Sequence, residues 1–164
     1  MANGNETRAD LIEVTVSGGF KTRHVFNTTG GILGVLELRG AKNEGYFQGV
    51  DGAEIQFKKT SFWKSHYLLE EGGAELGSAK PPRAISRSFD LIYGGEGLAV
   101  APVKGISRSW RLLDSRGDPI CEIKPRGAFK RGALIRILSQ VDVKLLVFVY
   151  CLVTRRWQEE SSAA

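Results

Sequence analysis

The sequence predicts a mainly β protein in which a sheet is wrapped around one hydrophobic helix at the C-terminal end. About a dozen short apolar segments, separated by breaks rich in glycine, fill the chain up to residue 138, and their spacing is that of an all-β barrel or sandwich. All 20 glycines and all 5 prolines lie at or before Gly132, so the last part of the chain has no backbone breaker. This last part contains the longest unbroken apolar run, Leu145 to Val153.

Residues 11–158 are expected to form one domain, flanked by disordered tails over 1–10 and 159–164. Alternating apolar and polar residues, many of them β-branched, predict the strands. In order, the segments are 11–16, 23–26, 32–38, 46–50, 53–57, 62–69, 74–79, 88–93, 98–103, 109–113, 120–123 and 133–138. The pair Asp51-Gly52 between two of them is a strong hairpin signal, because both central residues of such a turn need positive φ.

Two stretches of the chain resemble each other without gaps, residues 65–76 and residues 109–120. Each has an apolar run, an acidic residue before the turn, a glycine and a return strand. The matched residues are Leu68 with Leu112, Leu69 with Leu113, Glu70 with Asp114, Gly73 with Gly117, and Lys80-Pro81 with Lys124-Pro125. We interpret the repeat as a doubled half-barrel. The competing interpretation is that all hairpins look somewhat alike.

The apolar run Leu145–Val153 is expected to lie in a helix over about 140–158. Ser139 resembles an N-cap with the acidic Asp142 three positions later, and two arginines, Arg155 and Arg156, suit the negative end of the helix dipole. The run covers every face of such a helix, which must therefore be enclosed by protein or lipid. Nine apolar residues span about 14 Å against about 30 Å of hydrocarbon, which disfavours a transmembrane helix. A buried strand is the remaining alternative.

Composition restricts the function only weakly. The chain has 42% hydrophobic and 25% charged residues and a net charge of +5, which mildly favours acidic partners such as phospholipid head groups or nucleic acid. The polar N-terminus is unlike a secretory signal. The cysteines, Cys121 and Cys151, lie in apolar surroundings without metal-ligand spacing, so we expect reduced core residues in a cytoplasmic protein.

The chain resembles the tubby C-terminal-like superfamily, which includes the phospholipid scramblases and the plant LURP-one-related proteins. The resemblance rests on Trp110 to Ile123, which looks like a family hairpin with the pattern W-x-hydrophobic-x-D-x-x-G, and on the helix core Leu145 to Tyr150. In organisation it covers residues 11–158. It implies a closed β-barrel of about twelve strands that encloses the C-terminal helix, and it implies binding of phosphoinositides through basic surface residues.

A basic rim is the candidate ligand site, because no acid occurs between Ile123 and Val141. Its expected residues are Lys124, Arg126, Lys130, Arg131 and Arg136, joined by Lys80, Arg83 and Arg87 from the repeat-equivalent end. Cations near an anionic membrane each contribute about 1 kcal/mol of attraction. The alternative is an ordinary solvated loop face.

A second candidate patch contains Lys58, Lys59 and Lys64 beside the aromatic residues Phe62 and Trp63. Aromatic residues next to cations suit membrane interfaces and also single-stranded nucleic acid. The alternative is that both aromatic residues pack inside the barrel or at its mouth.

Catalysis finds little support in the sequence. The two histidines, His24 and His66, have no recognisable partner spacing, and the chain has no nucleophile elbow, P-loop or dinucleotide fingerprint. We therefore expect no enzyme activity, no metal and no cofactor. The leading hypothesis is a monomeric barrel that attaches peripherally to membranes by binding anionic phospholipid. A protein-interaction scaffold is the second hypothesis, and nucleic-acid binding is the least favoured.

Overall fold

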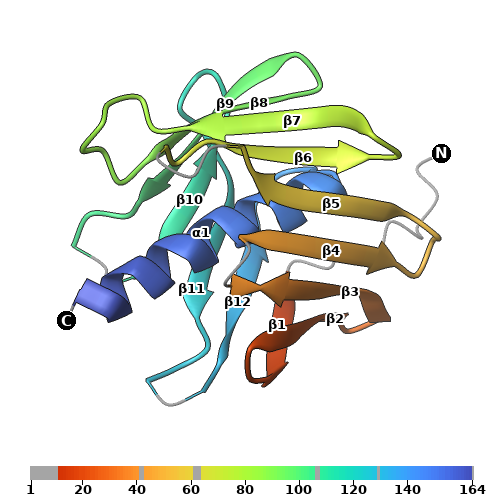
Figure 1. Ribbon diagram of the computed structural model, residues 1–164. Coiled ribbons are helices and arrows are strands. Elements are labelled where there is room, and N and C mark those ends of the chain that lie inside the picture. The colour runs from red at the N-terminus through yellow and green to blue at the C-terminus, as the bar shows by residue number, and fades with distance from the viewer. Residues whose placement is uncertain (1–10, 41–42, 61–63, 106–107, 129, 164) are drawn as a thin grey trace, which may run out of the picture.

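Twelve antiparallel strands close into a barrel around a single C-terminal helix in the computed structural model of this protein (Figure 1). The structure describes residues 11–40, 43–60, 64–105, 108–128 and 130–163. The predicted fold class, a closed barrel with an enclosed helix, is confirmed. The tail expected over residues 1–10 lies outside the described residues.

Each strand pairs with its neighbours in sequence, and β1 pairs with β12 to close the ring. The strands are β1 Leu11–Gly18, β2 Lys21–Thr28, β3 Gly31–Arg39, β4 Glu44–Gly49, β5 Glu54–Lys59, β6 Tyr67–Glu71, β7 Ala74–Lys80, β8 Phe89–Tyr93, β9 Glu96–Pro102, β10 Trp110–Leu113, β11 Pro119–Pro125 and β12 Gly132–Ile137. The helix α1 spans Val143–Ala163. Closure leaves no unpaired sheet edge among these strands.

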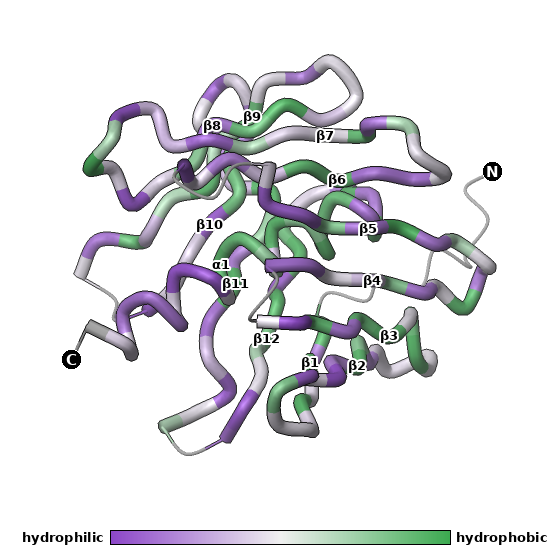
Figure 2. The backbone as a smooth tube through the Cα atoms, in the orientation of Figure 1, coloured by the Kyte–Doolittle hydropathy of each residue, from purple (hydrophilic) through white to green (hydrophobic). Residues whose placement is uncertain are grey.

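The period-2 alternation in the sequence becomes the inner and outer walls of the barrel. In β1, for example, Ile12 and Val14 are buried while Leu11 and Glu13 face solvent. Figure 2 shows the same change of hydropathy along the other strands and an apolar stretch of helix at the centre. The inward side chains of all twelve strands and the helix form one hydrophobic cluster.

Every residue of the run Leu145–Val153 is buried, with at most 7% of its surface exposed. The ring of Phe148 packs edge to face against Phe57 at 5.9 Å between centroids, and Tyr150 packs in the same manner against Phe26 at 5.1 Å. The run is helical, so the strand alternative is wrong. In the described part of the chain, no helix is long and apolar enough to cross a membrane.

The helix bounds differ from the expected 140–158 at both ends. Asp142, not Ser139, caps the N-terminus: its Oδ1 accepts a hydrogen bond of 2.9 Å from the backbone N–H of Lys144, and its carbonyl accepts one from Leu146. At the other end α1 continues to Ala163, so residues expected to be a tail are helical, and Arg155 and Arg156 lie before the last turn. The extension is held by contacts of the helix with the loops, described below.

The gapless repeat is out of register by one residue in its first strand. The sequence alignment matched Leu68 with Leu112 and Leu69 with Leu113. In the structure, however, Leu69 and Leu112 are fully buried, whereas Leu68 and Leu113 lie on the outer face. A slip of one residue moves a side chain to the opposite face of a sheet. Leu69 therefore corresponds to Leu112.

The interpretation as a doubled half-barrel is also wrong. A β-bulge follows Phe26 in β2, Leu69 in β6 and Leu112 in β10, and these three buried residues are equally spaced along the chain. The hairpins β2–β3, β6–β7 and β10–β11 are four strands apart in the ring of twelve, so the pattern recurs in each third of the barrel. Bulges increase local twist and help a sheet to close.

Candidate functional site

The two ends of the barrel differ because most polar residues of the helix lie in its last turns, which emerge at one end. There Arg156 Nε donates a hydrogen bond of 3.0 Å to the Arg87 carbonyl, and Trp157 Nε1 donates one of 3.0 Å to the Arg108 carbonyl. We call this end, where the odd-numbered strands finish, the exit end, and the opposite end the entry end. Antiparallel pairing places alternate turns at opposite ends.

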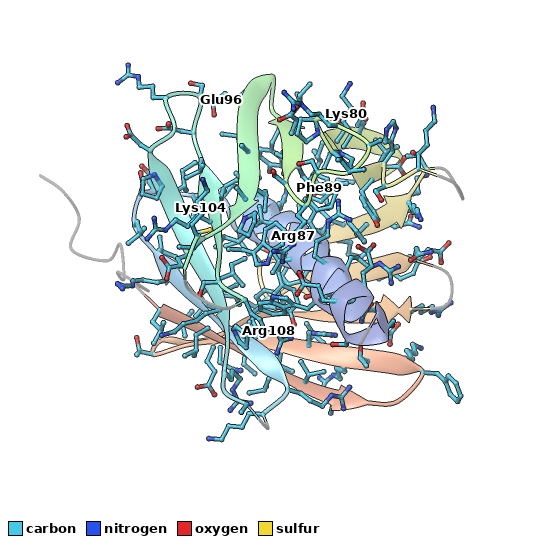
Figure 3. All side chains as sticks on the ribbon, turned by 90° about the vertical axis from the view of Figure 1, so that its left-hand side faces the viewer. Lys80, Arg87, Phe89, Glu96, Lys104 and Arg108 are labelled. Atoms are coloured by element: carbon cyan, nitrogen blue, oxygen red, sulfur yellow. The ribbon has the colours of Figure 1, made fainter. Side chains whose placement is uncertain are left out.

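Opposite charges collect at the two ends. Most cations of the described residues lie at the exit end, in or beside the turns that follow the odd-numbered strands and on the end of the helix. They are Lys21, Arg39, Lys58, Lys59, Lys64, Lys80, Arg83, Arg87, Lys104, Arg108, Lys124, Arg126, Lys130, Arg131, Arg155 and Arg156. Figure 3 faces this end, and its labelled cations, Lys80, Arg87, Lys104 and Arg108, are spread across the face that the helix leaves. In the described residues, the acids in or beside the entry-end turns are Asp51, Glu54, Glu71, Glu75, Glu96, Asp114, Asp118 and Asp142. Fewer acids lie at or near the exit end: Glu37, Glu44, Asp90, Glu159 and Glu160.

The exit end brings together most of the predicted basic rim. Lys80, Arg83, Lys124, Lys130 and Arg131 are all exposed there, although β7 and β11 are four strands apart. Sequence separation alone does not reveal this, because antiparallel pairing sets which strands finish at the same end and closure of the ring brings those ends together around the helix.

Two members of the predicted rim have other positions. Arg126 is half-buried and structural, since it pairs with Glu13 at 3.2 Å and donates a hydrogen bond to the Arg131 carbonyl. Arg136 does not belong to the rim: it faces outward late in β12, opposite Glu122, on the half of the barrel towards the entry end. The strand carries it away from the loop that holds Lys130.

The three lysines of the second predicted patch lie at the same exit end as the rim. Lys58 forms an ion pair of 2.9 Å with Glu70, which neutralises it in part, while Lys64 is exposed. Phe62 and Trp63 lie outside the described residues.

Two apolar side chains at the exit end are almost fully exposed, and sequence reasoning did not identify them as functional. Phe20 occupies the β1–β2 turn with 102% relative exposure, next to Lys21. Ile85 lies in the β7–β8 loop with 95% relative exposure, between Arg83 and Arg87. A large apolar residue in a connection between strands, with a cation one or two positions away, is the signal that could have found them.

A cleft of about 1100 Å³ opens at the exit end between the helix and the barrel wall. The helix contributes Tyr150, Thr154, Trp157, Gln158 and Ser161, which share one face at helical spacing. The opposite side comes from β1, β2 and the two loops before β10 and β12, which supply Val16, Thr22, His24, Arg108, Lys130 and Arg131.

A buried hydrogen-bonded chain forms the floor of this cleft. His24 Nδ1 lies 2.5 Å from the Tyr150 hydroxyl, and His24 Nε2 lies 2.7 Å from the Thr22 hydroxyl. Burial, aided by the positive charge of Arg131, lowers the pKa of His24 to about 4, so its imidazole is neutral at physiological pH. Burial raises the pKa of the Tyr150 phenol. The chain therefore offers neutral hydrogen-bonding groups rather than an active base.

Other candidate chemistry is limited in the described ranges. No group of three or more possible metal ligands occurs there. Cys121 and Cys151 are both buried and unpaired, as predicted, and burial raises the pKa of the Cys121 thiol to about 12.

Comparison with known proteins adds a fold relationship. No protein-family model and no curated protein matches the chain. Among solved structures, the X-ray structure of the Arabidopsis thaliana protein AT5G01750 is similar, with a TM-score of 0.61 over 90% of this chain and 91% of that chain, at 11% sequence identity. At this identity the similarity shows the fold alone, a barrel of the same architecture.

Proposed function

We propose that this protein is a non-catalytic, tubby-like barrel that docks on anionic membrane surfaces with its exit end. The observation that carries the proposal is the uneven distribution of charge, with an excess of cations around the helix exit and an excess of acids at the opposite turns. A dipolar charge distribution orients a protein as it approaches a charged surface. The acidic end would be repelled and the basic end attracted.

The magnitude of the attraction is adequate for reversible docking. Lys80, Lys124 and Lys130 are exposed and have no carboxylate within 4 Å among the residues that the structure places. Each cation close to an anionic leaflet adds about 1 kcal/mol, so several together give a total of a few kcal/mol. This range requires a second contribution for stable attachment.

The exposed side chains of Phe20 and Ile85 supply that second contribution. Both project from exit-end loops and both have cationic neighbours. An aromatic ring at the head-group level is favourable in membrane interfaces. Transfer of each side chain out of water is favourable by roughly 1.5–3 kcal/mol when it is fully buried. The combination of a cationic end and two apolar loop tips favours a membrane over a soluble acidic protein.

The assignment to the tubby-like class is supported by the sequence pattern and by the fold. A twelve-stranded ring around a C-terminal helix whose apolar run is buried agrees with the organisation expected of the tubby C-terminal-like superfamily. The similarity to the Arabidopsis protein supports this fold-level assignment, and it carries no information on a ligand.

The experiment is co-sedimentation with vesicles of neutral phosphatidylcholine, with and without phosphatidylserine. We expect binding only to the anionic vesicles. Lys130→Glu should weaken it by about tenfold or more, since it replaces an attraction by a repulsion, at about 1 kcal/mol each. Arg116→Glu is the matched control, because it makes the same change of net charge in an exposed entry-end turn.

A second matched pair tests the apolar loop tips. Phe20→Ser should reduce vesicle binding, while Val50→Ser, at a 72% exposed position in an entry-end turn, should not. Equal, negligible sedimentation with both kinds of vesicle would overturn the proposal. Equal effects of Lys130→Glu and Arg116→Glu would overturn the orientation. Strong, salt-sensitive retention of oligonucleotides without vesicle binding would favour a nucleic-acid role instead.

A further inference from the structure

The cleft between the helix and the barrel wall has a charge excess that its own residues do not balance. Four cations line it: Arg108, Lys130, Arg131 and Arg155. Within the described ranges, none of the four has a carboxylate within 4 Å, whereas seven other cations do. The one acid in the lining, Glu159, is already paired with Arg156 at 2.9 Å. The recess therefore lacks an internal counter-ion.

One buried polar group in the cleft has no partner. Thr154 lines the recess with only 8% of its surface exposed, and its Oγ1 has no hydrogen-bond partner among the described residues. A buried hydroxyl is normally hydrogen-bonded, so an unpartnered one needs an explanation. A ligand that accepts a hydrogen bond would satisfy this hydroxyl.

The cleft mouth is held in a fixed geometry. Trp157 donates a hydrogen bond to the Arg108 carbonyl, and the Arg108 guanidinium lies over the Trp157 ring at 5.4 Å from its centroid. Arg108 adopts a φ of 65°, which is unfavourable for a residue with a side chain. These contacts fix a guanidinium at the edge of the recess before any ligand enters. Guanidinium groups bind oxyanions through two parallel hydrogen bonds.

From this geometry we infer that the cleft is a binding site for a small soluble polyanion, whose clustered oxyanion groups are phosphates or carboxylates. Four cations and a single neutralised acid favour a ligand with more than one negative charge. One oxygen of the ligand accepts from Thr154, and others are held by Arg108, Arg155 and Lys130. The neutral His24–Tyr150 pair beneath the recess carries no negative charge that would compete with the ligand. Lys130 belongs to both proposed surfaces, whereas Thr154 and Arg155 belong to the cleft alone.

The experiment is isothermal titration calorimetry of the full chain with sodium pyrophosphate and, separately, citrate, without lipid, at roughly physiological ionic strength. We expect saturable binding of at least one probe at a stoichiometry of one. Thr154→Val preserves the shape of the side chain and removes the hydroxyl, so affinity should fall by about tenfold. Lys130→Gln should weaken binding by a similar factor. Lys124→Gln is the control, because Lys124 is an exposed exit-end cation outside the cleft.

Thermal unfolding of the same variants separates a ligand role from a structural one. Without ligand, Thr154→Val should unfold at the same or a higher temperature than the parent, because the lost hydroxyl has no partner. With pyrophosphate or citrate, the parent should gain stability and Thr154→Val should gain less. Retained binding by Thr154→Val, an equal loss in Lys124→Gln, or no binding of either probe would overturn the inference. Because no vesicle is present, none of these results depends on membrane docking.

Discussion

Lowering the pH from 7 to about 4 should destabilise the barrel through His24. The imidazole is 4% exposed, and its two ring nitrogens contact the hydroxyls of Tyr150 and Thr22. Protonation would place a positive charge in this buried position, near Arg131, and would require both ring nitrogens to donate. Burial therefore lowers the pKa of His24 from 6.5 to about 4.

The sign and size of the effect follow from proton linkage. Between pH 6.5 and about 4 the unfolded chain binds a proton at His24 that the folded protein does not bind. The free energy of unfolding therefore decreases as the pH falls through this window. Above pH 6.5 the contribution of His24 to this free energy does not change with pH. At about 1.4 kcal/mol per pH unit, His24 accounts for a loss of about 3 kcal/mol.

Urea unfolding at a series of pH values measures this loss. His24→Gln keeps a hydrogen-bonding side chain that does not titrate. Between pH 6.5 and 4, the free energy of unfolding of this variant should therefore fall by about 3 kcal/mol less than that of the parent. The difference between the two proteins removes the contribution of carboxylates common to both. Parallel pH profiles for the parent and His24→Gln would refute the reasoning, as would a His24 titration midpoint near 6.5 in an NMR experiment.

Three further predictions concern the core. Val149→Asp should abolish cooperative unfolding because Val149 is 0% exposed, while Val50→Asp in an exposed turn should fold normally, as read by circular dichroism. Leu69→Ala should lower the free energy of unfolding by about 2–5 kcal/mol and Leu68→Ala by less than about 1, and the reverse order would contradict the register derived from the bulges. Both cysteines should resist a thiol-reactive disulfide reagent at pH 8 in the folded protein, because burial raises the pKa of each thiol and suppresses the thiolate. They should react after unfolding, and rapid reaction of the native protein would contradict their burial.

The segments of the fold that could be predicted from sequence are those that depend on local pattern. The number of strands followed from apolar runs separated by glycine, and the enclosed helix followed from the run Leu145–Val153, which leaves no polar face. The N-cap was missed because Ser139 and Asp142 both suit the position, and only the backbone path decides which one begins the helix.

The candidate site was predicted only in part. The basic residues between Ile123 and Val141 were visible in the sequence, but the cations of other loops were not connected to them. The cleft joins β2, the loops before β10 and β12, and the helix, so its residues are far apart along the chain. The His24–Tyr150 contact, for example, joins residues 126 positions apart, and no sequence spacing indicates it.

By itself, the sequence determined that a sheet must surround an apolar helix, because hydrophobic periodicity and backbone breakers act locally. The tertiary structure alone decided which side of the wall Leu68 and Leu69 occupy, because strand pairing places Leu69 opposite the buried Phe57, and paired residues share a face. It also decided that cations from distant loops share one end, because antiparallel closure of twelve strands sends alternate turns to opposite ends. The helix is buried for most of its length, and only its last turns, with the loops around them, form the surface on which both proposals rest.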